Sequence, residues 1–116
     1  MKALSPEHIS RITRRAHALA DVTRIRIVQA LARTELPVGR IATALASEPS
    51  TISKHLQVLF REGLVTRRRA ASTVIYAIAD DGVLDWCRYF AQASVGSGRQ
   101  ITSAPERSRS DRLSRA

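Results

Sequence analysis

At 116 residues the chain is long enough for one domain with a modest core, and small enough that dimerisation would help it to bury apolar surface. Its 19 lysines and arginines outnumber its 10 acidic residues, and the net charge of +9 favours an anionic partner, for which nucleic acid is the simplest candidate. A membrane surface is the rival partner. However, no apolar run approaches the roughly 18 residues of a spanning helix and no signal-peptide pattern opens the chain, so we expect a cytoplasmic protein. A single cysteine excludes an intramolecular disulfide framework.

Three helices are predicted in the first part of the chain, at residues 5–19, 21–33 and about 38–46. The first places Ile9 and Ile12 on one apolar face, with arginines on the other. In the next two helices the apolar residues expected to face the core recur every three or four positions: Val22, Ile25, Val28 and Leu31, then Val38, Ile41, Ala42 and Leu45.

A fourth helix is predicted from Pro49, because proline is tolerated at a first helical position whose N–H has no intrahelical partner. Either Glu48 or Ser47 would cap it. One face follows a 3.6-residue period and should be buried, with the imidazole of His55 packed against backbone or a neighbouring side chain: Ile52, His55, Leu56 and Leu59. The opposite stripe carries hydroxyls, an amide and cations: Ser50, Ser53, Lys54, Gln57 and Arg61. Such side chains can engage base edges in the major groove, although an ordinary solvated helix carries the same residue types.

A basic β-hairpin should follow this helix. Gly63 stands where a helix end favours a left-handed residue, and the segments 64–66 and 73–78 are extended and rich in β-branched residues. Between them a run of three arginines, 67–69, lies near the predicted tip. Helix, glycine, strand, basic tip and strand is the layout of a winged helix, whose tip reaches DNA phosphates or the minor groove. Because Ala71 cannot easily adopt a positive φ, we expect a long, loose turn.

The last predicted helix runs from residue 83 to about 94, and its apolar surface is too broad for its length unless it also meets a second chain. From residue 96 the composition shifts to serine, glycine, arginine and proline. We therefore expect a DNA-binding and dimerisation domain at 1–95 and a flexible basic tail at 96–116. The tail could follow DNA phosphates, or it could serve only solubility.

Several of these segments together resemble the ArsR/SmtB winged-helix repressors: residues 19–27 (LADVTRIRI), 50–59 (STISKHLQVL), 62–65 (EGLV) and the arginine-rich wing ending in Tyr76. The resemblance covers roughly residues 8 to 92. It implies a mainly α winged helix-turn-helix of about five helices and a two-stranded wing, dimerising through its first and last helices. It also implies a palindromic DNA operator that is released when an inducer, often a metal ion, binds. The implied dimer contacts are Ile9, Ile12, Val83, Trp86, Cys87 and Phe90.

The metal sites of this family are not expected here. In metal-responsive relatives the third helix begins with a segment resembling Glu-Leu-Cys-Val-Cys-Asp-Leu, in which two thiolates bind a soft metal. The corresponding run, ELPVGRI at residues 35–41, has Pro37 and Gly39 at the thiol positions, and neither can ligate through a side chain. The second family site pairs carboxylates with histidines on the last helix, but no histidine follows His55. We therefore predict no metal and no other cofactor.

The leading hypothesis is a sequence-specific dimeric repressor. The residues expected to contact bases or phosphates are Ser50, Thr51, Ser53, Lys54, Gln57, Arg61, Arg67, Arg68 and Arg69. Alternatives are a sequence-tolerant architectural DNA binder, a repressor that senses oxidants through Cys87, and a protein-interaction module in which Lys54→Ala and Arg68→Ala leave DNA affinity unchanged. An enzyme is not expected, because the chain has no glycine-rich phosphate loop, no histidine beside a nucleophile and no clustered carboxylates.

Overall fold

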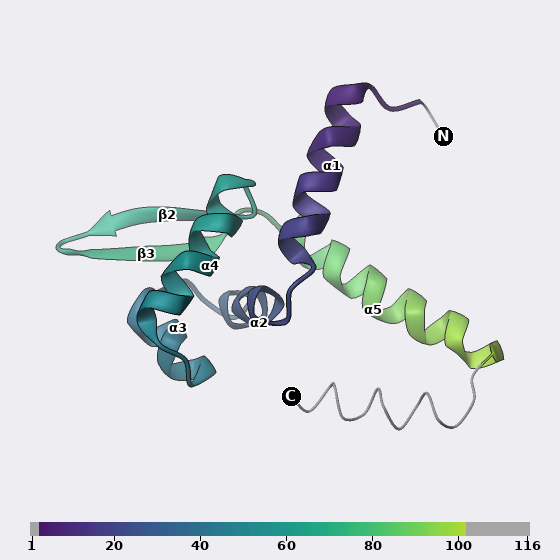
Figure 1. The fold of residues 1–116 in the computed structure, drawn as a ribbon. Helices are drawn as coiled ribbons and strands as arrows, with labels where there is room; N and C mark the ends of the chain where they lie inside the picture. Colours follow the sequence, from purple (N-terminus) through teal and green to yellow (C-terminus); the bar gives the residue numbers. More distant parts are fainter. Residues whose placement is uncertain (1–2, 102–116) are drawn as a thin grey trace. The chain divides into compact units, whose positions relative to one another are not determined.

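The computed structural model describes residues 3–101, with side chains through residue 93. Within these residues it contains five helices and three strands. In chain order they are α1 (Pro6–Leu19), α2 (Val22–Leu31), β1 (Leu36–Pro37), α3 (Val38–Leu45), α4 (Pro49–Arg61), β2 (Val65–Ala70), β3 (Thr73–Ile78) and α5 (Asp81–Ile101). Figure 1 labels the helices and the two longer strands, β2 and β3. This architecture confirms the mainly α winged helix-turn-helix that the sequence predicts. No helix in the described part of the chain is both long enough and apolar enough to cross a membrane.

The chain divides into two compact units, the first ending at Leu84 and the second beginning at Asp85. In the second unit α5 continues to Ile101, beyond the end expected near residue 94. The tail predicted for residues 96–116 therefore begins inside α5, and its residues 102–116 lie outside the described part of the chain.

The first two helices begin at side-chain caps. The hydroxyl of Ser5 accepts a hydrogen bond from the backbone N–H of His8, and Pro6 takes the first position of α1. A carboxylate oxygen of Asp21 accepts from the backbone N–H of Arg24 at 3.0 Å and caps α2. Each cap satisfies one of the N–H groups that a helix start leaves without a partner.

A short turn connects α3 to α4, and the two helices with this turn form the helix-turn-helix. Ala46 ends α3 in the left-handed conformation, with φ 53° and ψ 48°. Glu48 is the N-cap residue of α4 but makes no side-chain capping bond, and Pro49 occupies the first turn as expected. The turn therefore depends on one alanine in a conformation that glycine usually adopts.

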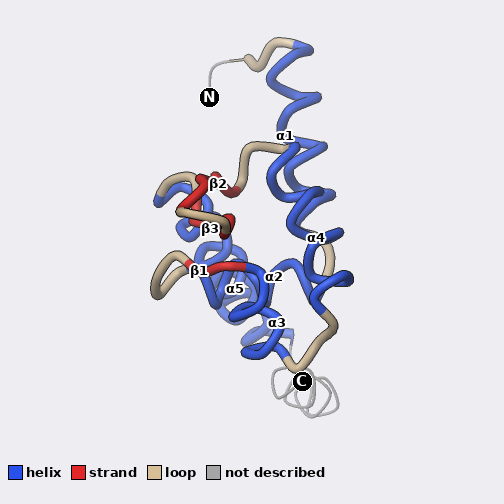
Figure 2. The backbone as a smooth tube through the Cα atoms, turned by 90° about the vertical axis from the view of Figure 1, so that its left-hand side faces the viewer, coloured by secondary structure: helices blue, strands red, loops and turns tan. Residues whose placement is uncertain are grey.

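The wing is part of a three-stranded antiparallel sheet with the order β1-β3-β2 (Figure 2). The prediction of two strands missed β1, in which Leu36 pairs with Tyr76 and Pro37 with Ile75. The expected long, loose wing turn is also wrong. Ala70 pairs directly with Thr73, so only two residues form the turn, and Ala71 adopts φ 58°. A two-residue hairpin favours positive φ because such turns match the twist of the paired strands.

The core lies between the helices and the base of the sheet. Its largest fully buried side chains are Ile27, Ile41, Ile52, Leu56, Leu59 and Val65. The inward face predicted for α4 is thus confirmed, whereas that of α2 is partly wrong because Val22 is 67% exposed. The buried face of α2 centres on Ile27, Val28 and Leu31, and at 3.6 residues per turn Val22 lies almost opposite. In α3, Ile41 and Ala42 are buried, while the two other predicted core residues are half-buried.

Candidate nucleic-acid interface

The polar stripe of α4 lies on the surface. Ser53 is half-buried, and the other residues of the stripe, together with the neighbouring Thr51, are exposed: Ser50, Thr51, Lys54, Gln57 and Arg61. The opposite face of the same helix is fully buried through Ile52, Leu56 and Leu59. The core therefore fixes the rotation of α4 about its axis, and this rotation presents hydroxyl, amide and cationic groups together.

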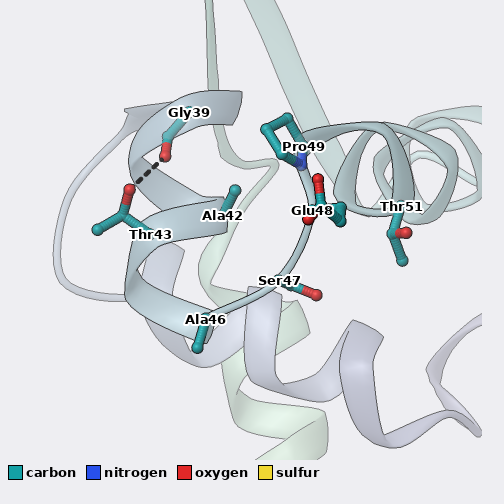
Figure 3. Close-up of a pocket in the computed structure, with 8 residues that line it drawn as sticks. All are labelled: Gly39, Ala42, Thr43, Ala46, Ser47, Glu48, Pro49 and Thr51. Atoms are coloured by element: carbon teal, nitrogen blue, oxygen red, sulfur yellow. Dashed lines mark hydrogen bonds between the residues drawn. The ribbon is translucent and has the colours of Figure 1, made fainter.

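An open groove of about 550 Å³ lies beside the N-terminal end of this stripe (Figure 3). The turn between α3 and α4 forms its floor, and its lining residues are Gly39, Ala42, Thr43, Ala46, Ser47, Glu48, Pro49 and Thr51. Gly39 is exposed, and its carbonyl accepts a hydrogen bond from the hydroxyl of Thr43 at 3.0 Å. The groove leaves the start of α4 accessible to a ligand. Pro49 has no N–H, the N–H of Thr51 already donates to the carbonyl of Glu48 at 3.1 Å, and Glu48 itself lines the groove, so this helix start offers little to an anion.

The three wing arginines do not form one surface. Side chains alternate along a strand, so Arg67 and Arg69 share a face with their paired residues on β3, and Arg68 takes the other face. The guanidinium of Arg67 lies 3.8 Å from the ring centroid of Phe60, at the end of α4. This cation–π contact places the base of the wing beside the C-terminal end of the polar stripe while leaving the positive charge of Arg67 unneutralised.

Arg68 instead binds a carboxylate. Its Nη2 lies 2.8 Å from Oε2 of Glu35, and its Nε lies 3.2 Å from Oε1. The hydrogen bond and charge of Arg68 lower the pKa of Glu35, and Glu35 in turn raises the pKa of Arg68. Glu35 therefore stays ionised throughout the neutral pH range. Sequence reasoning missed this contact because 33 positions separate the two residues and only the pairing of β1 with β3 brings them together.

Two side chains near the start of α2 contact the imidazole of His55, which lies on the inward side of α4. Its Nδ1 lies 3.1 Å from Nη1 of Arg24 and 3.9 Å from a carboxylate oxygen of Asp21. Arg24 also donates from Nε to the carbonyl of Ala18 at 2.6 Å. The packed, hydrogen-bonded imidazole predicted for His55 is confirmed, and the contact fastens α4 to the start of α2.

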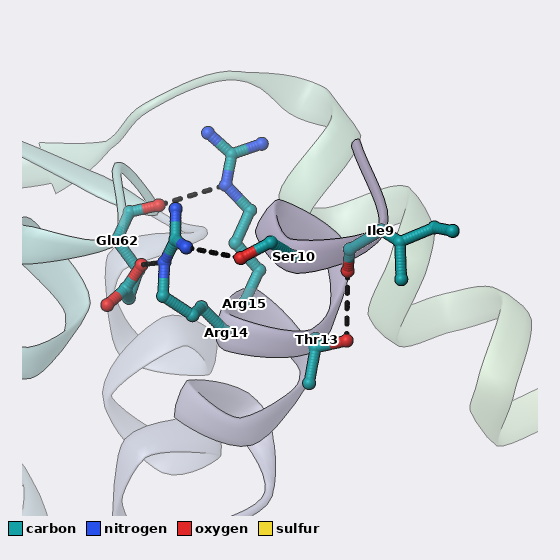
Figure 4. A network of polar contacts seen from close by, with 6 residues as sticks. All are labelled: Ile9, Ser10, Thr13, Arg14, Arg15 and Glu62. Atoms are coloured by element: carbon teal, nitrogen blue, oxygen red, sulfur yellow. Dashed lines mark hydrogen bonds and ion pairs between the residues drawn. The ribbon is translucent and has the colours of Figure 1, made fainter. Parts of the chain in front are cut away.

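A second polar network fastens the C-terminal end of α4 to α1 (Figure 4). Nε of Arg15 donates to the backbone carbonyl of Glu62 at 2.9 Å, and Nε of Arg14 donates to a side-chain oxygen of Glu62 at 3.2 Å. Arg14 also donates to the hydroxyl of Ser10 at 2.7 Å. Glu62 is the C-cap residue of α4 and the following Gly63 has φ 73°, so Arg15 supplies a partner for a carbonyl at the helix end.

The residues predicted for a dimer interface occupy different environments. Ile9 and Ile12 on α1 are 52% and 50% exposed, whereas Val83 is already buried within the chain at 7%. On α5, Trp86 and Cys87 are half-buried and Phe90 is exposed. The ring centroids of Trp86 and Phe90 lie 4.5 Å apart, and those of Tyr89 and Phe90 lie 5.4 Å apart. Both helices therefore present apolar side chains that their own unit leaves accessible.

The thiol of Cys87 is a weak nucleophile in this setting. Burial raises its pKa, and the charge of the adjacent Arg88 only partly opposes the effect. The thiolate is the species that reacts with oxidants and electrophiles, so the raised pKa lowers the reactive fraction of Cys87 at neutral pH.

The two positions that carry thiols in metal-responsive relatives are structural here. Pro37 ends β1 and precedes α3 as its N-cap residue, and Gly39 lies in the first turn of that helix. Within the described residues no three histidine, cysteine, aspartate or glutamate side chains gather as a set of metal ligands would.

Comparison of the sequence with known proteins finds bacterial transcriptional regulators. Residues 21–67 match the family model "Bacterial regulatory protein, arsR family". The chain is 40% identical over 74 residues to a "Transcriptional repressor SmtB homolog" of Synechocystis sp., covering 64% of this chain and 56% of the relative. It is 36% identical to the regulator Rv2034 of Mycobacterium tuberculosis over 90 residues, covering 74% of this chain and 84% of the relative. The chain spans little more than half the length of the SmtB homolog.

Solved structures give the same result. The homodimeric winged helix-turn-helix DNA-binding domain of Mb0332 from Mycobacterium bovis, described as a possible ArsR-family transcriptional regulator, superposes with a TM-score of 0.68 at 33% identity. This match covers 87% of the present chain and 94% of that domain. NolR of Sinorhizobium fredii superposes with a TM-score of 0.69 at 29% identity, covering 80% and 96% of the two chains.

Proposed function

The chain belongs to the ArsR family of bacterial regulatory proteins, and from that premise we propose that it is a sequence-specific, homodimeric DNA-binding repressor. The observation that carries the proposal is the polar stripe of α4. The apolar face of α4 is buried in the core, while Ser50, Lys54 and Gln57 are exposed together on the opposite side of the helix. A helix presented in this way can enter the major groove and form hydrogen bonds with base edges.

We assign separate tasks to the parts of this surface. Ser50, Thr51, Ser53, Lys54 and Gln57 would contact bases or adjacent phosphates, and Arg61, Arg67 and Arg69 would contact the backbone around them. The groove beside the start of α4 supports the assignment, because it leaves Thr51 accessible to DNA. The cation–π contact between Arg67 and Phe60 supports it as well, because the wing stays beside the helix that reads the bases.

A second copy would complete the DNA-binding unit. Ile9 and Ile12 on α1, and Trp86 and Phe90 on α5, supply the apolar surface for that contact. Mb0332, to which this chain is similar, is a homodimer. Two recognition helices related by a twofold axis would enter successive major grooves about 34 Å apart, so the operator should be palindromic.

The sensing role differs from that of thiolate-metal regulators. Pro37 and Gly39 replace the two ligating positions, and no alternative cluster of ligands gathers in the described part of the chain. We propose that release of DNA, where it occurs, does not depend on a metal bound at the start of α3.

The direct test is competition between operator and random DNA. Gel-shift with the promoter upstream of the protein's own gene should give an affinity at least about 10³-fold above that for random duplex of equal length. Lys54→Ala should reduce operator binding by about tenfold or more, and Gln57→Ala should reduce the preference for operator over random DNA. Arg26→Ala removes an exposed arginine from α2 and serves as the matched control.

Two outcomes would contradict the proposal. A ratio near one would favour the architectural DNA binder, because charge alone attracts any duplex. Unchanged DNA affinity in Lys54→Ala would favour a protein-interaction module built on the same scaffold.

A further inference from the structure

One wing arginine is occupied by a carboxylate of its own chain. The guanidinium of Arg68 meets Glu35 through two nearly parallel contacts, Nη2 to Oε2 at 2.8 Å and Nε to Oε1 at 3.2 Å. This side-on geometry is also the one in which arginine binds a phosphate. Glu35 therefore occupies the hydrogen-bonding edge that Arg68 would offer to a DNA backbone.

The register of the sheet builds this contact. Ile75 on the central strand β3 pairs with Arg68 on one side and with Pro37 on the other. Glu35 directly precedes β1, so its side chain can reach across β3 to the arginine. The contact is thus set by strand pairing rather than by a flexible loop.

The neighbouring arginines are in a different situation. Arg67 stacks on Phe60, and Arg67 and Arg69 lie on the opposite strand face from Arg68. Within residues 3–93, Arg68 is the one wing arginine whose charge an acidic side chain neutralises. The wing therefore presents two uncompensated cations on one face and a neutralised pair on the other.

Structural stabilisation is a weak reason for the pair. The Arg68 side chain is 58% exposed and that of Glu35 is 45% exposed. Ion pairs with this exposure contribute little to folding, because water screens the charges and ordering two long side chains costs entropy. The larger consequence of the pair is that an approaching anion meets a neutral pair instead of a free cation.

We propose that Glu35 withholds Arg68 from the DNA backbone, so that the wing contacts phosphates through its other two arginines and affinity for all DNA is held down. A phosphate contact adds affinity for every sequence alike, so its absence weakens operator and random DNA binding together and lowers the salt dependence of both. Glu35 thus sets how many phosphate contacts the wing can make, without touching DNA itself. This inference rests on the proposed DNA-binding function.

The test measures the affinity of the full chain for a random-sequence duplex by fluorescence anisotropy at several salt concentrations. Glu35→Gln should tighten binding roughly five- to tenfold near 0.1 M salt and steepen the slope of log K against log salt by about 0.9, the value of one added phosphate contact. Arg68→Ala alone should weaken binding, because it leaves the Glu35 carboxylate without its partner. The double variant Glu35→Gln/Arg68→Ala removes both charges and should bind within about twofold of wild type with an unchanged slope. Arg69→Ala should flatten the slope by about 0.9.

Two further variants distinguish withholding from simple charge repulsion. In an Arg68→Ala background, Glu35→Gln should relieve only charge repulsion, so it should tighten binding less than in the wild-type background and should not add the slope of about 0.9 of a new phosphate contact, because the arginine that it releases is absent. Glu7→Gln removes the same charge from α1 and should leave the slope unchanged. Circular dichroism of each variant establishes that the fold is retained.

The inference is overturned if the double variant Glu35→Gln/Arg68→Ala flattens the salt slope as much as Arg69→Ala does. It is also overturned if Glu35→Gln tightens binding equally with and without Arg68. If wild type binds no duplex at any salt concentration, the proposed function itself fails and this inference fails with it.

Discussion

At the level of single residues, Ala46 holds the turn of the helix-turn-helix in a left-handed conformation with φ 53° and ψ 48°. For an L-residue this conformation costs about 1 kcal/mol, a cost that glycine largely avoids. We expect Ala46→Gly to raise the free energy of unfolding by about 0.5 kcal/mol, because the greater freedom of glycine in the unfolded chain offsets part of the gain.

The matched control for this substitution is Ala44→Gly, which removes the same methyl group two positions earlier, inside α3. There the backbone is helical, and glycine should lower stability by about 1 kcal/mol. Urea unfolding at one protein concentration measures both variants. Equal effects of the two substitutions would show that the conformation of Ala46 carries no strain.

Cys87 leads to a second prediction at this scale. Burial raises the pKa of its thiol, so at pH 7 to 8 the reactive thiolate should be scarcer than in a free cysteine. We expect iodoacetamide to modify the folded protein more slowly than the urea-unfolded protein at the same pH. The modification rate of the folded protein should keep rising at pH values above the pKa of an ordinary cysteine, because the pKa of Cys87 is higher. Rapid modification of the folded protein at pH 7 would instead support sensing through this thiol.

At the level of elements, the junction of α1 with the end of α4 depends on a glycine. Gly63 has φ 73°, and a Cβ placed there would lie 3.1 Å from Nη2 of Arg15. Gly63→Ala should therefore lower stability by about 1–2 kcal/mol, from the left-handed backbone and from displacement of the arginine side chain. Thermal or urea unfolding measures this loss.

Gly39→Ala is the opposite case and serves as the control. Gly39 lies in α3, and a Cβ there meets nothing within 4 Å. Alanine is the better helix former, so this variant should be more stable by about 0.5–1 kcal/mol. Loss of stability in both variants would mean that the space and backbone angles at these two glycines do not decide the outcome.

The elements that could be predicted from sequence are those whose signals are local. Pro49 marks the start of α4, and the periodic apolar residues of that helix give its buried face. By contrast, β1 contains only two residues and exists because it pairs with β3, far along the chain. The Glu35–Arg68 contact depends on the same pairing. Local patterns therefore predict α4 and its buried face, while the contact made by Arg68 depends on tertiary structure.

The tight wing turn also depends on strand pairing that local sequence patterns do not reveal. Propensity argues against positive φ at Ala71, yet the register of β2 with β3 leaves only two residues to connect the strands. The pairing of the two strands therefore overrides the preference of one alanine. Similarly, the apolar residues of α2 are compatible with more than one buried face until the neighbouring helices are in place, so the sequence pattern predicts the wrong face for Val22.

At the level of the whole molecule, the proposed repressor needs two copies of the α4 stripe on one duplex. Ile12 on α1 is 50% exposed, and an apolar side chain at that position is accounted for if a second chain covers it. We expect Ile12→Glu to convert the dimer into a monomer, because two carboxylates related by the twofold axis would be buried without partners. A monomer reaches only one half-site, so operator affinity should fall by about 10²-fold or more.

Val22→Glu provides the comparison, since Val22 is a more exposed apolar residue, at 67%, on α2. It introduces the same charge outside the proposed interface, so this variant should stay dimeric and keep its operator affinity. Light scattering after size-exclusion chromatography measures the mass of each species, and circular dichroism checks that the helices remain. A dimer that persists in Ile12→Glu would exclude α1 from the contact between subunits, because two like charges cannot be buried together there without a large loss of association energy.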